Sequence, residues 1–250
     1  MRYLVVSDLH SNLEALEAVL AAARGRYDRV ICCGDLVGYG ADPNAVVEWV
    51  RANAVAVVRG NHDKACCGIT DALEFNTAAR AAAHWTRAQL TAENMSYLQA
   101  LPVGPLPIDG FQIVHGSVQD EDDYIFVARD AAEDFPRLGH RLTFFGHTHL
   151  QGGFVRVAGG GVLAVEPSFS PGVASQVLEL QERDQYLLNA GSVGQPRDAD
   201  SRAAFATYAD DVGFGVVEYW RAPYDIAATQ AKMALAGLPD VLIRRLSLGR

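Results

Sequence analysis

Positive charge is scarce in this chain of 250 residues, which has 21 lysines and arginines against 30 aspartates and glutamates. The formal net charge of -9 argues against broad binding to nucleic acids, because such binding needs a basic surface to face the phosphate backbone. It does not exclude a small substrate that carries phosphate, since bound metal ions can reverse the local sign of the charge.

Long apolar runs and secretion signals are lacking as well. No apolar stretch approaches the ~20 residues that a membrane-spanning helix needs. The first residues, from Met1 to Asp8, lead directly into a polar motif without the features of a signal peptide. We therefore expect a cytoplasmic protein with no membrane partner.

Cysteine is rare and occurs as two adjacent pairs, Cys32–Cys33 and Cys66–Cys67. Adjacent pairs have neither the C-x-x-C spacing of a structural zinc site nor the spread of a secreted disulfide framework. We expect both pairs to be packing residues, as is usual for free cysteine, with redox chemistry at the second pair as the alternative.

Five short apolar runs each end in polar residues that can bind metal. These polar groups are Asp8-Leu9-His10, Gly34-Asp35, Gly60-Asn61-His62-Asp63, His115-Gly116 and Gly146-His147-Thr148-His149. Five of the seven histidines of the chain fall within them. Because the carboxyl ends of neighbouring strands converge on one crevice in layered α/β proteins, we expect these side chains to form one site.

Strands and helices alternate at the start of the chain, which predicts an α/β fold with a mostly parallel sheet. We expect helices after Asn12 and from Pro43, and two more at 76–90 and 91–101, where residues 71–101 are the candidate for a helical cap. Beyond His149, short β-rich runs between glycines predict a second, more antiparallel sheet, and a helix at 224–236 is expected to close the chain. With no repeat or linker, residues 1–250 are expected to form a single domain.

The spacing within the motifs suits metal binding. Asp8 and His10 are two residues apart, as are His147 and His149, so each pair can point the same way in an extended chain. Carboxylate, imidazole and amide ligands together suit divalent manganese, iron, zinc or nickel better than calcium or magnesium. Asp35 is a carboxylate beyond those that one ion needs, which makes it the candidate to bridge two divalent ions.

The motifs D-x-H, G-D, G-N-H-D, H-G and G-H-T-H, in this order over residues 3–149, resemble those of the calcineurin-like metallophosphoesterase superfamily. The run 188–198 is similar to the N-x-G-S-V segment of its small bacterial and archaeal phosphodiesterase branch. The resemblance implies a four-layer α/β/β/α sandwich of two mixed sheets flanked by helices. It also implies a two-metal centre, with one ion held by Asp8, His10 and His149, the other by Asn61, His115 and His147, and Asp35 as the bridge.

The activity implied by this resemblance is hydrolysis of a phosphodiester in a small-molecule substrate by a hydroxide that bridges the metals. His62, adjacent to Asn61 but outside the metal set, is the candidate catalytic residue, either as proton donor to the leaving oxygen or as a stabiliser of the transition state. Asp63 is a candidate to orient it, with a surface turn as the equal alternative. Asn12 is a candidate substrate contact that can also cap a helix.

One departure bears on the substrate. The protein serine/threonine phosphatases of the superfamily have Asp-Arg-Gly where this chain has Gly38-Tyr39-Gly40, so an arginine that would bind a phosphomonoester is absent there. The ring of Tyr39 is instead a candidate contact for a base or aryl group. Arg59 and Arg197 are candidate substrate contacts as well, although we expect a structural role for each. We expect substrate recognition within 71–101 and 116–128.

Three functions therefore stay open. The first is a metal-dependent phosphodiesterase, and the second is a phosphomonoesterase or dinucleoside-polyphosphate hydrolase on the same site. The third is a noncatalytic scaffold of the kind that arises when such proteins lose ligands. Retention of every expected ligand and of His62 disfavours the scaffold.

Overall fold

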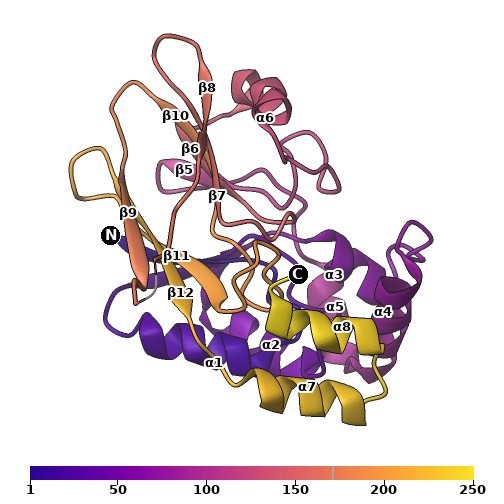
Figure 1. Cartoon of the computed structure of the whole chain (residues 1–250). Coiled ribbons are helices and arrows are strands. Elements are labelled where there is room, and N and C mark those ends of the chain that lie inside the picture. Colours follow the sequence, from indigo (N-terminus) through magenta and orange to yellow (C-terminus); the bar gives the residue numbers. More distant parts are fainter. Residues whose placement is uncertain (171) are drawn as a thin grey trace.

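The computed structural model describes residues 1–170 and 172–250 and has two mixed β-sheets of six strands each (Figure 1). The first sheet has the order β3-β2-β1-β11-β12-β9, with the bounds Ala54–Val57, Arg29–Cys32, Arg2–Val6, Ala203–Ala209, Val216–Ala222 and Ser175–Glu179. The second sheet has the order β4-β5-β6-β10-β7-β8, with the bounds Leu106–Ile108, Phe111–Ile113, Leu142–Phe145, Gln185–Asn189, Gly152–Arg156 and Val162–Val165.

Helices cover the outer faces of both sheets. Helix α1 packs against β11 and β12 of the first sheet, and α6 packs against β7 and β8 of the second (Figure 1). The four-layer α/β/β/α sandwich is thereby confirmed. The helices are α1 Leu13–Ala22, α2 Pro43–Asn53, α3 Asn61–Cys66, α4 Thr77–Gln89, α5 Ala92–Gln99, α6 Ala128–Asp134, α7 Ile226–Leu235 and α8 Asp240–Arg245, with single 3-10 turns at Phe135–Arg137 and Leu246–Leu248.

Aromatic side chains from both sheets form the core between them. The ring of Phe111 on β5 packs edge-on against Tyr3 of β1 at a centroid distance of 5.0 Å and against Tyr208 of β11 at 5.3 Å. Phe144 of β6 joins the same group, and all four rings are buried. Edge-to-face pairs of this kind add directional attraction to the burial of a large apolar area. They fix the two sheets relative to each other.

Local expectations for the helices agree with the structure. Asn12 caps α1 by accepting a hydrogen bond from the backbone N–H of Ala15 at 3.1 Å, and Pro43 is the first residue of α2. The four cysteines are free and buried, and burial raises the pKa of the Cys66 thiol well above its usual value, which favours packing over redox chemistry. No helix in the described part of the chain is long and apolar enough to cross a membrane.

Two expectations were wrong. The strands after His149 do not form a sheet of their own, because β9, β11 and β12 extend the first sheet whereas β7, β8 and β10 join β4, β5 and β6 in the second. Strand β11 is buried along nearly its whole length and pairs antiparallel with β1, placing Tyr208 opposite Tyr3. The chain also continues past the expected last helix, since α8 follows α7 after a left-handed turn at Gly237 (φ 70°).

Candidate metal centre

The five motifs meet at one end of the sandwich, where strands of both sheets stop. Strands β1, β2 and β3 of the first sheet lead into Asp8, Asp35 and Asn61, whereas β5 and β6 of the second lead into His115 and His147. Backbone hydrogen bonds join the loops, including Asp8 N to Gly34 O at 2.9 Å and Gly146 N to His115 O at 2.9 Å. The site therefore needs both sheets.

Two buried clusters of acidic and imidazole groups share Asp35. The first contains Asp8, His10, Asp35 and His149, the second contains Asp35, His115 and His147, and within each cluster one ligand atom per residue lies within 4.8 Å of the others. The Oδ2 atom of Asp35 is 3.6 Å from Nε2 of His10 and 3.5 Å from Nε2 of His115, so this carboxylate stands between the clusters. Asn61 lies beside the second, with Oδ1 at 3.3 Å from Nε2 of His115.

The imidazoles are oriented by backbone carbonyls, which can only accept hydrogen bonds. Nδ1 of His10 donates to Val37 O at 3.0 Å, Nδ1 of His115 to Cys33 O at 2.8 Å, and Nδ1 of His149 to Gln195 O at 2.6 Å. Nε2 of each ring therefore faces the carboxylates. Hydrogen bonds of this kind orient the histidine ligands of metal sites in proteins. His147 is turned the other way, because its Nε2 donates to Asp122 O at 3.0 Å and leaves Nδ1 for a ligand.

Burial sets most of the charge balance. It raises the pKa of Asp8 to about 7 and lowers the pKa of His147 to about 3, because each group loses water. Burial would also lower the pKa of His115, but the carboxylate of Asp35 raises it to about 10 and is itself held well below its usual pKa. The pair thus places a positive charge beside Asp35, where a bound cation would replace the proton.

The residues present fit a divalent cation. The Oδ2 atoms of Asp8 and Asp35 are buried and have no hydrogen-bond partner among the described residues. Nε2 of His10 and Nε2 of His149 face each other at 3.0 Å. Buried carboxylate oxygens without partners are costly, and mixed oxygen and nitrogen donors are the ligand set of transition metals.

Backbone strain is concentrated here. Among the residues that the structure describes, most non-glycine residues with positive φ belong to this site, namely Asp8, His10, Ser11, Asp35, Tyr39, His147 and His149, with φ between 47° and 67°. Such conformations each cost about 1–3 kcal/mol and persist only where surrounding structure enforces them. Their clustering in the loops that follow β1, β2 and β6 marks a functional site.

His62 lies beside the first cluster but is not one of the four residues that form it. Its backbone N–H donates to Oδ1 of Asp35 at 2.8 Å, and its ring packs between Tyr39 at 4.3 Å and Phe75 at 4.4 Å. Burial lowers the pKa of His62 to about 4, and its Nδ1 has no partner within the described chain. Asp63 does not orient it, because both carboxylate oxygens accept backbone N–H groups of Leu36, Val37 and Gly60.

The two candidate substrate contacts have structural partners. Asn12 is buried, and its amide donates to Gly194 O at 3.0 Å while its carbonyl caps α1. Tyr39 is 6% exposed and packs against His10 at 4.6 Å as well as His62, so its ring offers no open face to a base. The helices at 77–99 pack on α2 and α3.

An open cavity of about 430 Å³ adjoins Asn61 and His147. Lys64, the segment 70–75, Asp122 and Tyr124 also line it. Tyr124 is 45% exposed and stacks on the His147 ring at 3.8 Å. The sequence pointed to the surrounding segment but not to this tyrosine, because nothing in its local pattern distinguishes an exposed aromatic residue from a buried one.

Comparison with known proteins gives consistent matches. Residues 1–211 match a family model described as the calcineurin-like phosphoesterase superfamily domain. An uncharacterized protein of Methanocaldococcus jannaschii is 36% identical over 251 residues, which cover 98% of this chain and 97% of that protein. A metallophosphoesterase from Sphaerobacter thermophilus has a TM-score of 0.88 and 42% identity, with 100% of this chain and 99% of that chain covered. A hypothetical protein from Pyrococcus horikoshii shares the fold, with a TM-score of 0.77, 18% identity and coverage of 100% and 98%.

The packing of Gly60 against Asp35 can be tested directly. A Cβ atom at Gly60 would overlap Oδ1 of Asp35 and lie 2.5 Å from its backbone nitrogen, although the backbone of Gly60 itself is unstrained. We expect Gly60→Ala to lower the free energy of unfolding by about 1–3 kcal/mol, the usual cost of overpacking. Gly159→Ala is the control, because a Cβ there meets nothing within 4 Å. Urea unfolding followed by circular dichroism measures both, and equal stability of the two variants would contradict this view of the site.

Proposed function

Because the chain belongs to the calcineurin-like phosphoesterase superfamily and is therefore a hydrolase of phosphate esters, we propose that it cleaves phosphodiester bonds in small molecules with two divalent transition-metal ions. The observation that carries this proposal is the pair of buried clusters that share Asp35. Manganese, iron, zinc and nickel are the ions that suit such mixed ligands.

The ligands divide between the clusters. Asp8, His10 and His149 would hold one ion, Asn61, His115 and His147 the other, and Asp35 would contact both. When bound, such a pair of ions supplies Lewis acidity for activating water and positive charge for neutralising phosphate oxygens. Asp8 and Asp35 neutralise the charge of two divalent ions only in part, so the site attracts an anionic phosphate.

His62 is the residue that we assign to the leaving oxygen. Its ring contacts Tyr39 and Phe75, and the residue is buried. The low pKa keeps the imidazole neutral in the free protein, so the ring would take up a proton from water when an anionic phosphate binds beside it. Held next to Asp35 through its backbone, the protonated His62 would then transfer this proton to the leaving oxygen as negative charge develops there and return to the neutral form.

The cavity supports a diester rather than a monoester. A diester has a second organic group, and the cavity of about 430 Å³ beside Asn61 and His147 provides room for it. A diester also carries one negative charge fewer, so it needs fewer arginines, in keeping with Tyr39 at the position where related phosphatases have one. We further propose that the chain forms a single domain and that its expected cap at 71–101 contacts the substrate through residues 71–75. These residues line the cavity.

Phosphomonoester or dinucleoside-polyphosphate hydrolysis is the second candidate. One observation favours it. The guanidinium of Arg197 is 3.2 Å from the hydroxyl of Tyr39, the residue that stands where related phosphatases have an arginine. A dianionic or terminal phosphate gains more from such a charge than a diester does. The noncatalytic scaffold is disfavoured because all proposed ligands lie together.

We expect two metal ions per chain after reconstitution with manganese. Asp35→Asn should lower the metal content more than Asn61→Ala, because only Asp35 contacts both clusters. Elemental analysis of desalted protein measures this, with Asp240→Asn as the control because the Asp240 side chain is exposed at the start of α8. One ion or none in an active wild-type protein would contradict the two-metal proposal.

His62→Ala should keep the metals and lower turnover about 100-fold or more, the scale of general acid catalysis. The loss should be smaller for nitrophenyl esters than for alkyl esters, because an activated leaving group needs less protonation. Steady-state kinetics on both esters measure it, with His84→Ala as the control because His84 is exposed and outside the motifs. Equal losses on the two esters would mean that His62 only positions the substrate.

The ester preference separates the two candidate functions. We expect a higher kcat/KM on bis(nitrophenyl) phosphate than on nitrophenyl phosphate in manganese at the same pH, because the cavity accepts a second organic group. A clear preference for the monoester would overturn the diesterase proposal and leave the metal centre untouched.

A further inference from the structure

Arg197 brings an uncompensated positive charge to the edge of the candidate metal centre. It takes part in no ion pair with the described residues, whereas Arg202 and Arg221 of the same region pair with Asp200 and Asp198. Its Nε atom is buried and finds no hydrogen-bond partner in residues 1–170 and 172–250. In a chain with a net charge of -9, acidic partners are plentiful, so an arginine left without one is available to an anionic ligand.

The guanidinium is held in place by neutral groups. Nη2 donates to the Tyr39 hydroxyl at 3.2 Å and to Oε1 of Gln195 at 3.1 Å. The backbone carbonyl of Gln195 accepts the hydrogen bond from Nδ1 of His149, and the backbone N–H of Arg197 donates to His149 O at 3.3 Å. One short segment therefore orients both a proposed metal ligand and this arginine, which reduces the entropy lost on binding an anion.

The charge lies close to the proposed reaction centre. The ring of Tyr39, whose hydroxyl accepts from Arg197, contacts His10 at 4.6 Å and His62 at 4.3 Å.

The other arginine beside the motifs is engaged elsewhere. Arg59 donates to Glu121 through Nε at 3.2 Å and Nη2 at 2.6 Å, a two-bond ion pair that satisfies its charge. The expected structural role fits Arg59 but not Arg197. Arg197 thus brings a guanidinium next to position 39, where the sequence itself has no arginine.

We propose that Arg197 binds a nonbridging oxygen of the substrate phosphate and sets how strongly the site favours a dianionic over a monoanionic phosphate. Tyr39 and Gln195 are positioning residues, because they act through the guanidinium. A planar fork of N–H donors matches two oxygens of a phosphate, which a lysine ammonium does not. The inference rests on the proposed function in one respect, that a phosphate group binds at this centre.

Two small anions without an ester bond test the inference. Methylphosphonate is a dianion in mildly alkaline solution, and dimethylphosphinate is a monoanion of similar shape. Calorimetric titration of the manganese-loaded protein with each gives the affinity without any hydrolysis. We expect Arg197→Gln to weaken methylphosphonate binding about 10-fold or more, the effect of a lost charge-assisted hydrogen bond, and dimethylphosphinate binding by less than about 3-fold.

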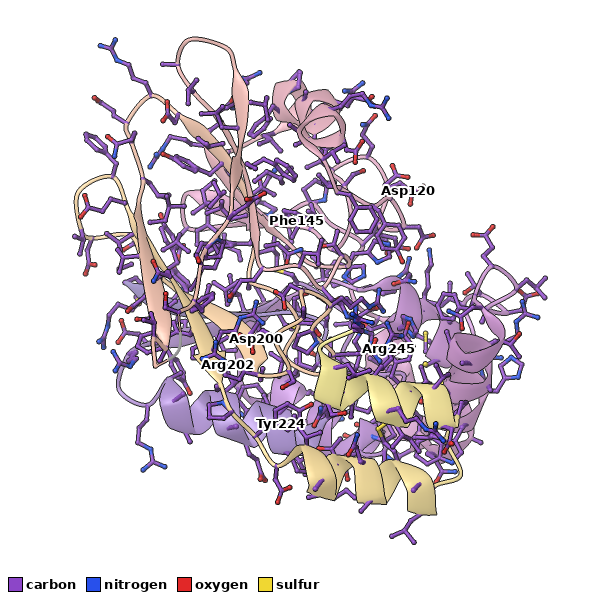
Figure 2. The ribbon with its side chains drawn as sticks, in the orientation of Figure 1. Asp120, Phe145, Asp200, Arg202, Tyr224 and Arg245 are labelled. Atoms are coloured by element: carbon purple, nitrogen blue, oxygen red, sulfur yellow. The ribbon has the colours of Figure 1, made fainter. Side chains whose placement is uncertain are left out.

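Further variants make the test specific. Arg197→Lys should fall between wild type and Arg197→Gln, and Tyr39→Phe should weaken methylphosphonate in the same direction by a smaller factor. Arg202→Gln is the matched control, because Arg202 is paired with Asp200 in the same part of the molecule (Figure 2). Manganese content and thermal melting verify that each variant is folded.

The outcomes are distinct. Unchanged methylphosphonate affinity in Arg197→Gln, or equal weakening of both anions, overturns the inference. If Arg197→Gln does not fold, unchanged methylphosphonate affinity in both Arg197→Lys and Tyr39→Phe overturns it. Neither anion can be hydrolysed at an ester, so failure of the protein to cleave bis(nitrophenyl) phosphate would end the diesterase proposal without affecting this result. A kinetic extension follows, in which Arg197→Gln shifts the ratio of kcat/KM values toward the diester.

Discussion

The burial of the Asp35 carboxylate between two sets of imidazoles is the constraint on which the rest of the site depends. Its Oδ2 atom lies within 3.6 Å of His10 and 3.5 Å of His115, while Oδ1 accepts the backbone N–H of His62. A buried carboxylate is costly unless it is paired or hydrogen bonded. Gly60 has to lack a side chain because Asp35 occupies the space that a Cβ would need. The strained backbone at neighbouring positions follows from the same demand, since each loop must turn its side chain toward one point.

This arrangement makes the centre a property of the sandwich as a whole. The carboxylates come from loops of the first sheet, and His115, His147 and His149 come from loops of the second. The distance between the two sets is therefore fixed by the aromatic core around Phe111 and by the loops that hydrogen bond across the sheets. Loss of packing in this core would therefore disturb the distance between the two halves of the ligand set.

Local features of the sequence predicted the superfamily, the helices α1, α2, α4, α5 and α7 and the residues that meet at Asp35, because each of these is set by spacing within a short segment. The assignment of strands to sheets could not be predicted in this way. The pairing of Tyr3 with Tyr208 joins residues from opposite ends of the chain, and hydrophobic periodicity carries no information on such partners. The same limit applies to Arg197. Two aspartates follow it closely in sequence, but in the folded protein they form ion pairs with Arg221 and Arg202.

We expect the distribution of charge around the centre to orient a substrate. The ammonium of Lys64, which lines the cavity, is held by Glu121 at 3.2 Å and by Asp122, so it is not a free cation for a phosphate. Arg197 has no acidic partner among the described residues, and its guanidinium is hydrogen bonded to Tyr39 at 3.2 Å. Under the two proposals, the charged oxygens of the phosphate point toward Arg197 and the organic group enters the cavity beside Tyr124. Charge and organic group would then be recognised by residues outside the proposed ligand set, so that each preference can change without the loss of a ligand.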